Sequence, residues 1–522
     1  MRSVFRLPLL VALALVIVAV VDAHRVHNLR SFRGHGYLLS LGPRHADGSD
    51  NATSAGNTTD DPQYAHIKEL YFDEAIVDHA APVNKRTFWK QRYFVNEQFW
   101  AGRDFPVFVF IGGEGPLGPR TLTDRNFIHF LAEKHRALLV AVEHRFYGKS
   151  YPTADMSLEN LRFLTSEQAL ADLARFHAFL TDHYGLEGAP WVAFGGSYPG
   201  NLAAWVKLKY PALFAGTVAS SAPLLAKRDF SEYMEVVGDG LRYFGGGECY
   251  DRVEASIRAL RELMDGGREG RAQIAKLFEP CYPMVNEFDD SVFESSVMGA
   301  FQDIAQYNGL REGAMTLSDV CALFSKDDKT PPIERLASFL RQTRTKPCLD
   351  SKFEGEANAT VNVLRETAFD GESSSRQWFY QTCNEFGYFQ TTNSAHSPFA
   401  ALRTLDERNV GLEVCKRVFE IDGSPDIRGT NLDYGALGIT VENVTFPSGT
   451  IDPWHALAVK NDTALRSTTA EAVYIDGTAH CADMYYPRAN DSAAIQWAHT
   501  KIAAAVERYL GGASPTAELA IE

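Results

Sequence analysis

Short apolar runs alternate with helical patterns in the first half of the chain, and this alternation limits the possible folds most strongly. Phe105–Ile111, Ala137–Val142 and Trp191–Phe194 have the apolar, β-branched and aromatic content of buried strands. Before the third run, apolar residues at helical spacing predict a helix that begins at Thr165, with Gln168 completing a capping box. Strands that alternate with helices form βαβ units, so we expect an α/β fold with a mostly parallel sheet.

The pattern becomes mainly helical over residues 227–428, and strand-like segments return only after it. We therefore expect one α/β domain in two parts, 62–226 and 429–512, interrupted by an inserted helical cap domain. A helix at 492–510 would close the second part. The insert contains six of the seven cysteines, which could form three disulfides in an oxidising compartment: Cys249, Cys281, Cys321, Cys348, Cys383 and Cys415. The seventh, Cys481, would be a buried neighbour of a site or a free thiol.

The ends of the chain predict export. Within residues 1–23, two arginines precede an apolar run that is too short to span a bilayer, which is typical of a cleaved signal peptide. Residues 24–61 have the composition of a flexible leader or pro-segment, and 513–522 that of a flexible tail. After cleavage we expect no membrane anchor. Six sequons predict N-glycosylation, at Asn51, Asn57, Asn358, Asn443, Asn461 and Asn490.

Charge and cysteine spacing exclude several classes of protein. The net charge of −15 argues against nucleic acid as a partner, because phosphate binding needs a basic face. No C-x-x-C pair is present, which argues against a zinc or redox motif. We therefore expect neither a metal nor a cofactor.

The segment Gly195–Gly200 (GGSYPG) follows a predicted strand and opens a helical pattern. This is the context of the nucleophile elbow of α/β-hydrolases, in which Ser197 would sit on a strained turn. The strict motif has glycine at the place of Pro199, but proline fits the first helical turn, where its missing N–H forms no bond anyway. The alternative is an ordinary glycine-rich turn between a strand and a helix, so the interpretation needs partners elsewhere in the chain.

Two partners follow Ser197 in the order serine, acid, histidine that α/β-hydrolases use. Asp452 comes after the predicted strand 439–446, and His480 comes after the predicted strand 472–475. Parallel sheets gather their sites at these carboxyl ends. A turn for the aspartate and a polar loop for the histidine are each the commoner role when either residue is taken alone. Together the three predict a triad, with Ser197 as nucleophile, His480 as base and Asp452 as the acid that orients it.

The reaction would also need donors for an oxyanion. We expect the backbone N–H groups of Tyr198, Gly113 and Glu114 to supply them, because the latter two lie in the loop after the first long strand. Asp483 could cap or support His480, and His144 is expected to be structural. Cys481 as a nucleophile is the weaker alternative, since the serine already fills that role.

Many sequence blocks carry a family resemblance that covers about residues 65–510. The matching blocks include FIGGEGP (110–116), EHRFYGKSYP (143–152), GGSYPGNLAAW (195–205), DPW (452–454) and the His480 block. They resemble the serine carboxypeptidase family that contains lysosomal Pro-X carboxypeptidase, dipeptidyl-peptidase II and thymus-specific serine protease. TCNEFGYFQT (382–391) and AHCADM (479–484) are most similar to the thymus-specific branch. The resemblance implies an α/β-hydrolase domain with a helical insertion, the same triad roles, and an exopeptidase that cleaves at or after proline.

Aromatic residues of the insert are candidates for specificity. Trp378, Phe386, Tyr388 and Trp454 could wall a proline-sized pocket, or they could simply form cap core. Glu385 could bind a substrate amino terminus or form a salt bridge within the cap. We expect peptide substrates and a secreted, lysosomal or vacuolar location, and we leave open a homodimer and the choice between carboxypeptidase and dipeptidyl-peptidase. An esterase or lipase, or a catalytically silent binding protein, are the competing functions.

Overall fold

The computed structural model describes residues 62–326 and 329–512. The expected signal peptide, leader and tail, together with Asn51 and Asn57, lie outside these residues. Eight strands form one sheet, with the order β1-β2-β4-β3-β5-β6-β9-β10. The strands are β1 (Ile67–Ile76), β2 (Phe88–Asn96), β3 (Val107–Ile111), β4 (Leu138–Val142), β5 (Trp191–Gly196), β6 (Gly216–Ser220), β9 (Val444–Gly449) and β10 (Glu471–Ile475). The six strands from β4 to β10 in this order pair in parallel, which confirms the expected α/β class.

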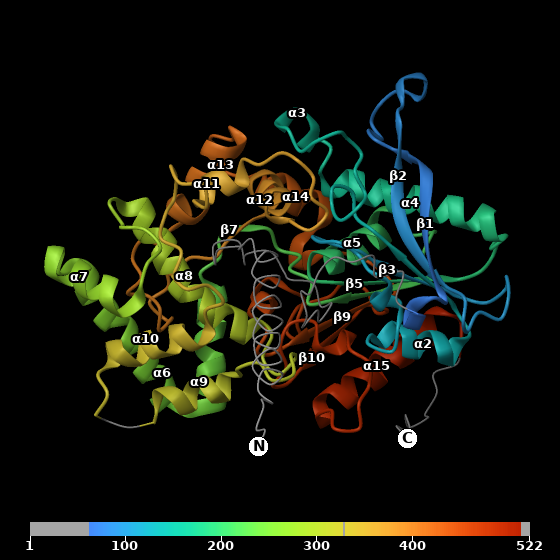
Figure 1. Ribbon diagram of the computed structural model, residues 1–522. Coiled ribbons are helices and arrows are strands. Elements are labelled where there is room, and N and C mark those ends of the chain that lie inside the picture. Colours follow the sequence, from blue (N-terminus) through green and yellow to red (C-terminus); the bar gives the residue numbers. More distant parts are fainter. Residues whose placement is uncertain (1–61, 327–328, 513–522) are drawn as a thin grey trace, which may run out of the picture.

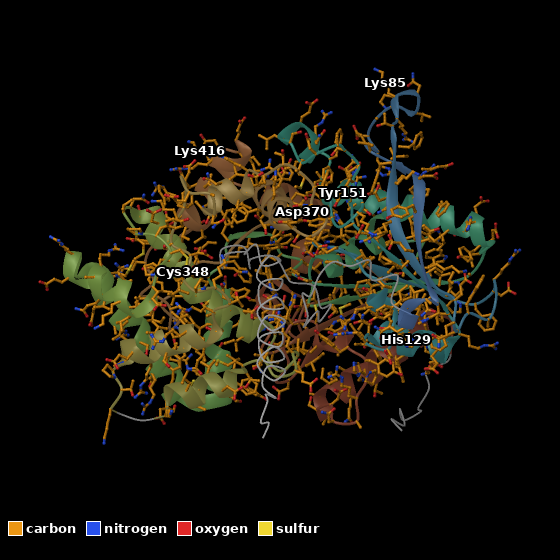
Figure 2. The ribbon with its side chains drawn as sticks, in the orientation of Figure 1. Lys85, His129, Tyr151, Cys348, Asp370 and Lys416 are labelled. Carbon is orange, nitrogen blue, oxygen red and sulfur yellow. A yellow bond between two sulfur atoms is a disulfide. The ribbon has the colours of Figure 1, made fainter. Side chains whose placement is uncertain are left out.

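The first two strands differ from the others. β1 and β2 pair antiparallel with each other, and β2 pairs antiparallel with β4. The hairpin projects beyond the rest of the sheet, with Lys85 at its end (Figures 1 and 2). Beside Lys85, Val83 is 79% exposed, so the end of the hairpin contributes nothing to the core.

Helices cover both faces of the sheet. Alternate side chains of a strand point to opposite faces, and along β3 Val109 belongs to one hydrophobic cluster whereas Phe108 and Phe110 belong to another. The first cluster includes α4 (Ser166–Tyr184) and α5 (Tyr198–Lys209), and the second includes α2 (Phe127–His135) and α15 (Ala493–Tyr509). Because both faces are covered, the central strands are apolar throughout rather than alternating.

The helix expected from Thr165 is α4, and its cap differs in one detail. The Thr165 side chain accepts a hydrogen bond from the Gln168 N–H at 3.2 Å, as expected for an N-cap. The Gln168 side chain does not complete a capping box, because its amide bonds to the backbone N–H of His79 and to the Asp78 carboxylate. The predicted N-cap bond of Thr165 is therefore present, but the reciprocal bond from the Gln168 side chain is not. That side chain instead contacts the connection between β1 and β2.

The helical segment lies between β6 and β9 and beside the sheet (Figure 1). It comprises α6 (Glu232–Asp265), α7 (Gly267–Phe278), α8 (Glu287–Gln306), α9 (Leu317–Phe324), α10 (Pro332–Thr343), α11 (Thr360–Leu364), α12 (Ser375–Gln381), α13 (Glu413–Phe419) and α14 (Ile427–Tyr434). Two short strands, β7 (Lys227–Asp229) and β8 (Gly387–Phe389), pair within it. Tyr434 stacks on Trp205 of α5 at 4.1 Å between ring centroids, which joins the segment to the sheet domain.

Three disulfides close loops inside the helical segment, as the cysteine count predicted. They join Cys249 to Cys321, Cys281 to Cys348, and Cys383 to Cys415. Cys481 is free and buried. Among the described residues, no helix combines the length and the apolar character that a membrane span requires.

The strand before Asp452 begins and ends later than the sequence predicted, whereas the strand before His480 ends where it was predicted, at Ile475. β9 covers 444–449 rather than 439–446, because Asn443 has the left-handed backbone angle φ 56° and interrupts the extended chain. The Asn443 side chain donates to the carbonyl of Ala215, and this contact fixes the chain there. The shift brings the end of β9 to within three residues of Asp452.

Candidate active site

Ser197 lies at the junction of β5 and α5 with the strained backbone angles φ 63° and ψ −131°. Few residues other than glycine adopt a positive φ, so an observed one marks a backbone that its surroundings enforce. The Ser197 N–H donates to the carbonyl of Ser220 on the neighbouring strand at 2.9 Å. Pro199 occupies the first turn of α5, as predicted. The turn therefore has the strand–serine–helix form of a nucleophile elbow.

Two glycines make this turn possible. A Cβ at Gly195 would lie 2.0 Å from the carbonyl oxygen of Pro199, and one at Gly200 would lie 2.6 Å from the carbonyl oxygen of Ser220. Both distances are far below van der Waals contact, and both obstacles are backbone atoms. Only glycine lets the helix start so close to the strand that carries it.

We predict that Gly195→Ala lowers the free energy of unfolding by about 3 kcal/mol or more, because the added methyl group must displace the backbone of α5. The matched control is Gly438→Ala, where a Cβ meets no atom within 4 Å. Urea unfolding of both variants measures the difference. Equal midpoints for the two variants would contradict this account of the turn.

Asp452 and His480 form a close pair in the loops after β9 and β10. The His480 Nδ1 lies 2.9 Å from each carboxylate oxygen of Asp452. The Asp452 Oδ1 also accepts a hydrogen bond from the Trp454 N–H at 3.0 Å, which fixes the carboxylate. Asp452 is fully buried and His480 is 2% exposed. Burial alone would lower the pKa of His480, but the Asp452 carboxylate raises it well above its ordinary value.

The pair lies against the serine turn. Gly196 precedes Ser197, and Cys481 follows His480. A Cβ at Gly196 would lie 2.9 Å from the Sγ of Cys481. The Cys481 N–H also donates to the Ser221 Oγ, just beyond β6. The other ring nitrogen, His480 Nε2, is buried and has no hydrogen-bond partner among the described residues. It therefore forms no hydrogen bond with the Ser197 hydroxyl in this structure.

Backbone N–H groups lie near the serine turn on two adjacent segments. The Tyr198 N–H belongs to the first turn of α5, where helical N–H groups have no partner inside the helix. The loop after β3 lies beside this turn because β3 pairs with β5. In that loop, the N–H of Gly112 donates to Val142 and that of Gly115 donates to Gly113. The N–H groups of Gly113 and Glu114 lie between these two bonds, at the carboxyl edge of the sheet.

Gln306, at the end of α8, is a contact that sequence reasoning missed. Its carbonyl oxygen accepts from the His480 N–H at 3.0 Å. Its side-chain Oε1 accepts from the Trp454 Nε1 at 3.1 Å and from the Tyr233 hydroxyl at 2.6 Å. Through Gln306, the helical segment therefore contacts both His480 and the Trp454 loop that carries Asp452. No local pattern distinguishes this glutamine, because its partners lie far from it in the chain.

We predict that Gln306→Leu lowers kcat/KM about tenfold and the free energy of unfolding by about 2 kcal/mol, because two buried donors lose their acceptor. The loss of activity follows from a looser Trp454 loop, which carries Asp452. Gln342→Leu, on the exposed face of α10, is the control. Peptide hydrolysis and thermal unfolding are the measurements, and wild-type values for both would refute this role.

The aromatic candidates gather beside Ser197 and His480. Trp378 and Phe386 pack against Tyr198, with ring centroids at 5.9 and 5.4 Å. Tyr388 packs against Trp454 at 5.4 Å, and Trp454 lies 6.4 Å from His480. All of these rings are buried. They contact one another as core residues do, and they also border the serine turn.

Glu385 has its hydrogen-bond partner outside the aromatic cluster. Both of its carboxylate oxygens accept from the Ser166 N–H, at 3.0 and 3.2 Å, at the start of α4. Burial raises its pKa to about 7. Its carboxylate stabilises the amino-terminal end of a helix, where a negative charge is favourable.

His144 and Asp483 contact groups that surround the site. The His144 Nε2 lies 3.1 Å from the Tyr198 hydroxyl, so this histidine fixes the tyrosine that follows the serine. Asp483, which the sequence offered as a cap or support for His480, accepts through its Oδ1 from the Ser220 Oγ at 2.5 Å. This contact follows from the turn after His480, which directs Asp483 toward the end of β6.

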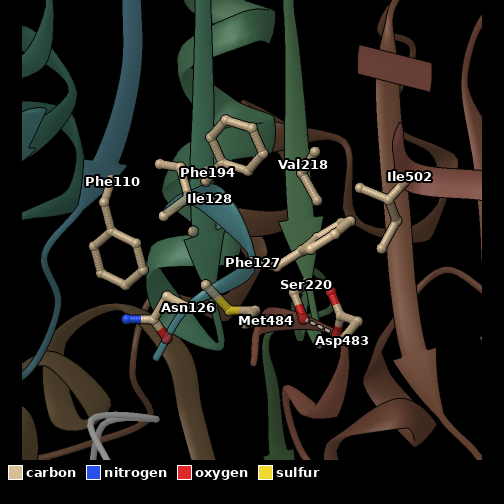
Figure 3. A pocket seen from close by; sticks show the side chains of 11 residues that line it. Phe110, Asn126, Phe127, Ile128, Phe194, Val218, Ser220, Asp483, Met484 and Ile502 are labelled. Carbon is tan, nitrogen blue, oxygen red and sulfur yellow. Dashed lines mark hydrogen bonds between the residues drawn. The ribbon is translucent and has the colours of Figure 1, made fainter. Parts of the chain in front are cut away.

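A small pocket lies behind the serine turn, on the α2 and α15 face of the sheet. Figure 3 shows Phe110, Phe194 and Val218 pointing toward it from three strands, with Ser220 and Asp483 side by side at one end. Burial raises the pKa of Asp483 to about 6. The apolar lining suits packing, and the bond between Ser220 and Asp483 satisfies the polar end.

The described sequons differ in exposure. Asn358, Asn461 and Asn490 are exposed, as a glycosylated asparagine must be. Asn443 is half-buried, and its amide nitrogen donates to the Ala215 carbonyl. Among the residues that the structure describes, no cluster of side chains could hold a metal ion.

The parallel sheet and the strained serine turn define an α/β-hydrolase. The chain belongs to the serine carboxypeptidase S28 family, whose sequence profile matches residues 75–502. It is therefore a serine-type peptidase. It is 32% identical to human thymus-specific serine protease, over 86% of this chain and 88% of the relative. It is 27% identical to mouse lysosomal Pro-X carboxypeptidase, over 88% and 91%.

Solved structures with a related fold include two distant hydrolases. Proline iminopeptidase of Mycobacterium smegmatis is 13% identical and aligns with 85% of this chain and 98% of its own, with a TM-score of 0.34. An esterase of Pyrobaculum calidifontis is 12% identical and aligns with 85% and 84%, with a TM-score of 0.32.

Proposed function

We propose that this chain is a serine exopeptidase that hydrolyses peptide bonds next to proline, with Ser197, Asp452 and His480 as its catalytic triad. The observation that carries the proposal is the buried contact of 2.9 Å between His480 and Asp452, placed beside a serine on a strained turn. This combination of an oriented imidazole and a strained backbone turn has no evident structural purpose.

The mechanism follows from the positions of these groups. His480 Nε2 takes the proton of the Ser197 hydroxyl as the oxygen attacks the scissile carbonyl. Asp452 keeps the proton on Nδ1 and stabilises the imidazolium that forms. The N–H groups of Tyr198 and of the Gly113–Glu114 loop hold the oxyanion. His480 then protonates the leaving amine, and water hydrolyses the acyl-enzyme by the same steps in reverse.

The burial of the site supports an exopeptidase. Ser197 is 6% exposed, and the helical segment contacts the His480 loop through Gln306. A folded protein cannot present an internal loop to such a site, whereas the end of a short peptide can enter it. We assign residues 227–428 as the cap domain that restricts access.

The aromatic cluster supports a preference for proline. Trp378, Phe386, Tyr388 and Trp454 offer flat apolar faces beside the serine, and a pyrrolidine ring packs well on such faces. Mouse lysosomal Pro-X carboxypeptidase, whose similarity covers 88% of this chain, is named for a Pro-X specificity. The three disulfides indicate an oxidising compartment, and we place the protein in the secretory pathway, as a secreted or lysosomal glycoprotein.

The test compares substrate classes on the purified protein between pH 4 and 7. We expect turnover of X-Pro peptides and covalent labelling by a fluorophosphonate probe, which reacts with activated serines. Hydrolysis of short acyl esters with no peptide turnover would instead favour an esterase. The absence of both labelling and turnover would leave a binding protein on a hydrolase fold, and would refute the proposal.

A further inference from the structure

Glu114 has a buried side chain that the triad mechanism does not use. Glu114 is 2% exposed, and neither carboxylate oxygen has a hydrogen-bond partner in any other described residue. A buried polar group without a partner costs free energy, and a buried charge without one costs more. Burial raises the pKa of Glu114 to about 8, so the group is protonated at neutral and acidic pH.

The surroundings of Glu114 place it in the active site. Glu114 lies in the loop after β3, and the parallel pairing of β3 with β5 sets this loop beside the serine turn. Its carboxyl group is close enough to interact electrostatically with His480, Tyr147, Tyr198 and Tyr388, which are all buried. The three tyrosines bring hydroxyl groups but no positive charge. The imidazole of His480 is already paired with the Asp452 carboxylate, so the Glu114 carboxyl group has no cation of its own among these neighbours.

A substrate can supply that cation at its amino terminus. A carboxy-terminal substrate group would instead need a positive side chain, and the buried arginines are already occupied. Arg92 is ion-paired with Glu143, and Arg145 with Asp172. Arg376 donates to backbone carbonyls. The charge balance of the site therefore favours a positively charged substrate end.

We propose that the Glu114 carboxylate binds the α-ammonium group of the substrate, so that the enzyme removes a short segment from the amino terminus of a peptide. This inference rests on the proposed function and selects one direction of cleavage. The backbone of Glu114 borders the scissile carbonyl, and its carboxyl group lies one side-chain length away. That span matches about one or two residues of extended peptide, which fits release of a dipeptide with proline second.

Binding would move one proton. The free enzyme holds a protonated Glu114, and the bound state holds a carboxylate beside an ammonium group. The proton of the carboxyl group is therefore released to solvent when a charged amino terminus binds below pH 8. No such release accompanies a peptide whose amino terminus is acetylated.

The kinetic test uses Glu114→Gln, which keeps the backbone N–H, and Glu187→Gln as an exposed control. The substrates are Ala-Pro-aminomethylcoumarin and its N-acetyl form. We expect the wild type to prefer the free amine by at least about 100-fold, and Glu114→Gln to reduce this ratio to within a few-fold of one. An unchanged ratio, or a wild type that prefers the acetylated form or benzyloxycarbonyl-Pro-Phe, overturns the inference.

A binding test separates this inference from the proposed function. Ala-Pro and N-acetyl-Ala-Pro are titrated calorimetrically into Ser197→Ala at pH 6, in buffers of different ionisation enthalpy. We expect the free dipeptide to bind more tightly and to release about one proton. Equal affinity without proton release overturns the role of Glu114, even if peptides are cleaved. If no peptide is cleaved, the same titration still decides whether the site binds an ammonium group with release of a proton, and repeating it with Glu114→Gln in the Ser197→Ala background assigns that proton to Glu114. Because the first titration needs no Glu114 variant, poor folding of Glu114→Gln does not affect it.

Discussion

Ser197→Ala is expected to lower kcat/KM for X-Pro peptides by at least about 10⁴-fold, because the variant has no nucleophile to form the acyl-enzyme. The remaining rate would come from the oxyanion donors and from substrate binding, which the substitution leaves in place. The fold should persist. The strained backbone at residue 197 is held by the bond from its N–H to Ser220 and by the glycines around it, not by the hydroxyl group.

The measurement is steady-state hydrolysis, with fluorophosphonate labelling and thermal unfolding as companions. Ser338→Ala, in α10 of the helical segment, is the matched control and should retain wild-type activity. Labelling should disappear in Ser197→Ala alone. If the variant retained a tenth of the activity while still being labelled, another residue would be the nucleophile, and Cys481 would be the first to test.

The elbow could be predicted from sequence because its determinants are local. Gly195, Ser197, Pro199 and Gly200 lie within six residues, and the steric reasons for each act within the same turn. The strands around it could be predicted for a similar reason. A buried parallel strand must be apolar throughout, so the apolar run of β3 was enough to predict a strand there, even though its neighbouring strands were not known.

Asp452 and His480 could be predicted only by their order and by their places after strands. No local pattern in the sequence predicts the contact between the two side chains. It arises because β9 and β10 pair in parallel, which brings their carboxyl ends together. The error in the bounds of β9 did not matter, because Asp452 follows the strand with either the predicted or the observed end.

The contacts that were missed depend on side chains from distant segments. Gln306 reaches His480 and Trp454 from the end of α8, and Glu385 reaches the start of α4. A glutamine or glutamate in a helical insert has many equivalent roles in sequence. Only the packing of the insert on the sheet selects one of them. The unpartnered carboxyl group of Glu114 is of the same kind, since burial cannot be read from a glycine-rich loop.

Asp452→Asn should lower kcat by about 10⁴-fold while leaving KM and stability close to wild type. Asparagine can still accept the Trp454 N–H, so the loop keeps its shape. Its amide nitrogen, however, can present a donor to His480 Nδ1, which then must accept. The ring proton moves to Nε2, and that nitrogen can no longer take the proton of Ser197.

The comparison that isolates this effect uses Asp476→Asn, an exposed aspartate in the turn after β10, as control. In Asp452→Asn, kcat for peptide hydrolysis and the rate of fluorophosphonate labelling should both fall. In every other measured property, Asp452→Asn should match the control variant. Labelling matters here because it requires an activated serine but no leaving amine. A slow reaction with peptide and a normal rate of labelling would place Asp452 in substrate binding instead. Loss of both, with unchanged thermal unfolding, is the result that only an orienting acid explains.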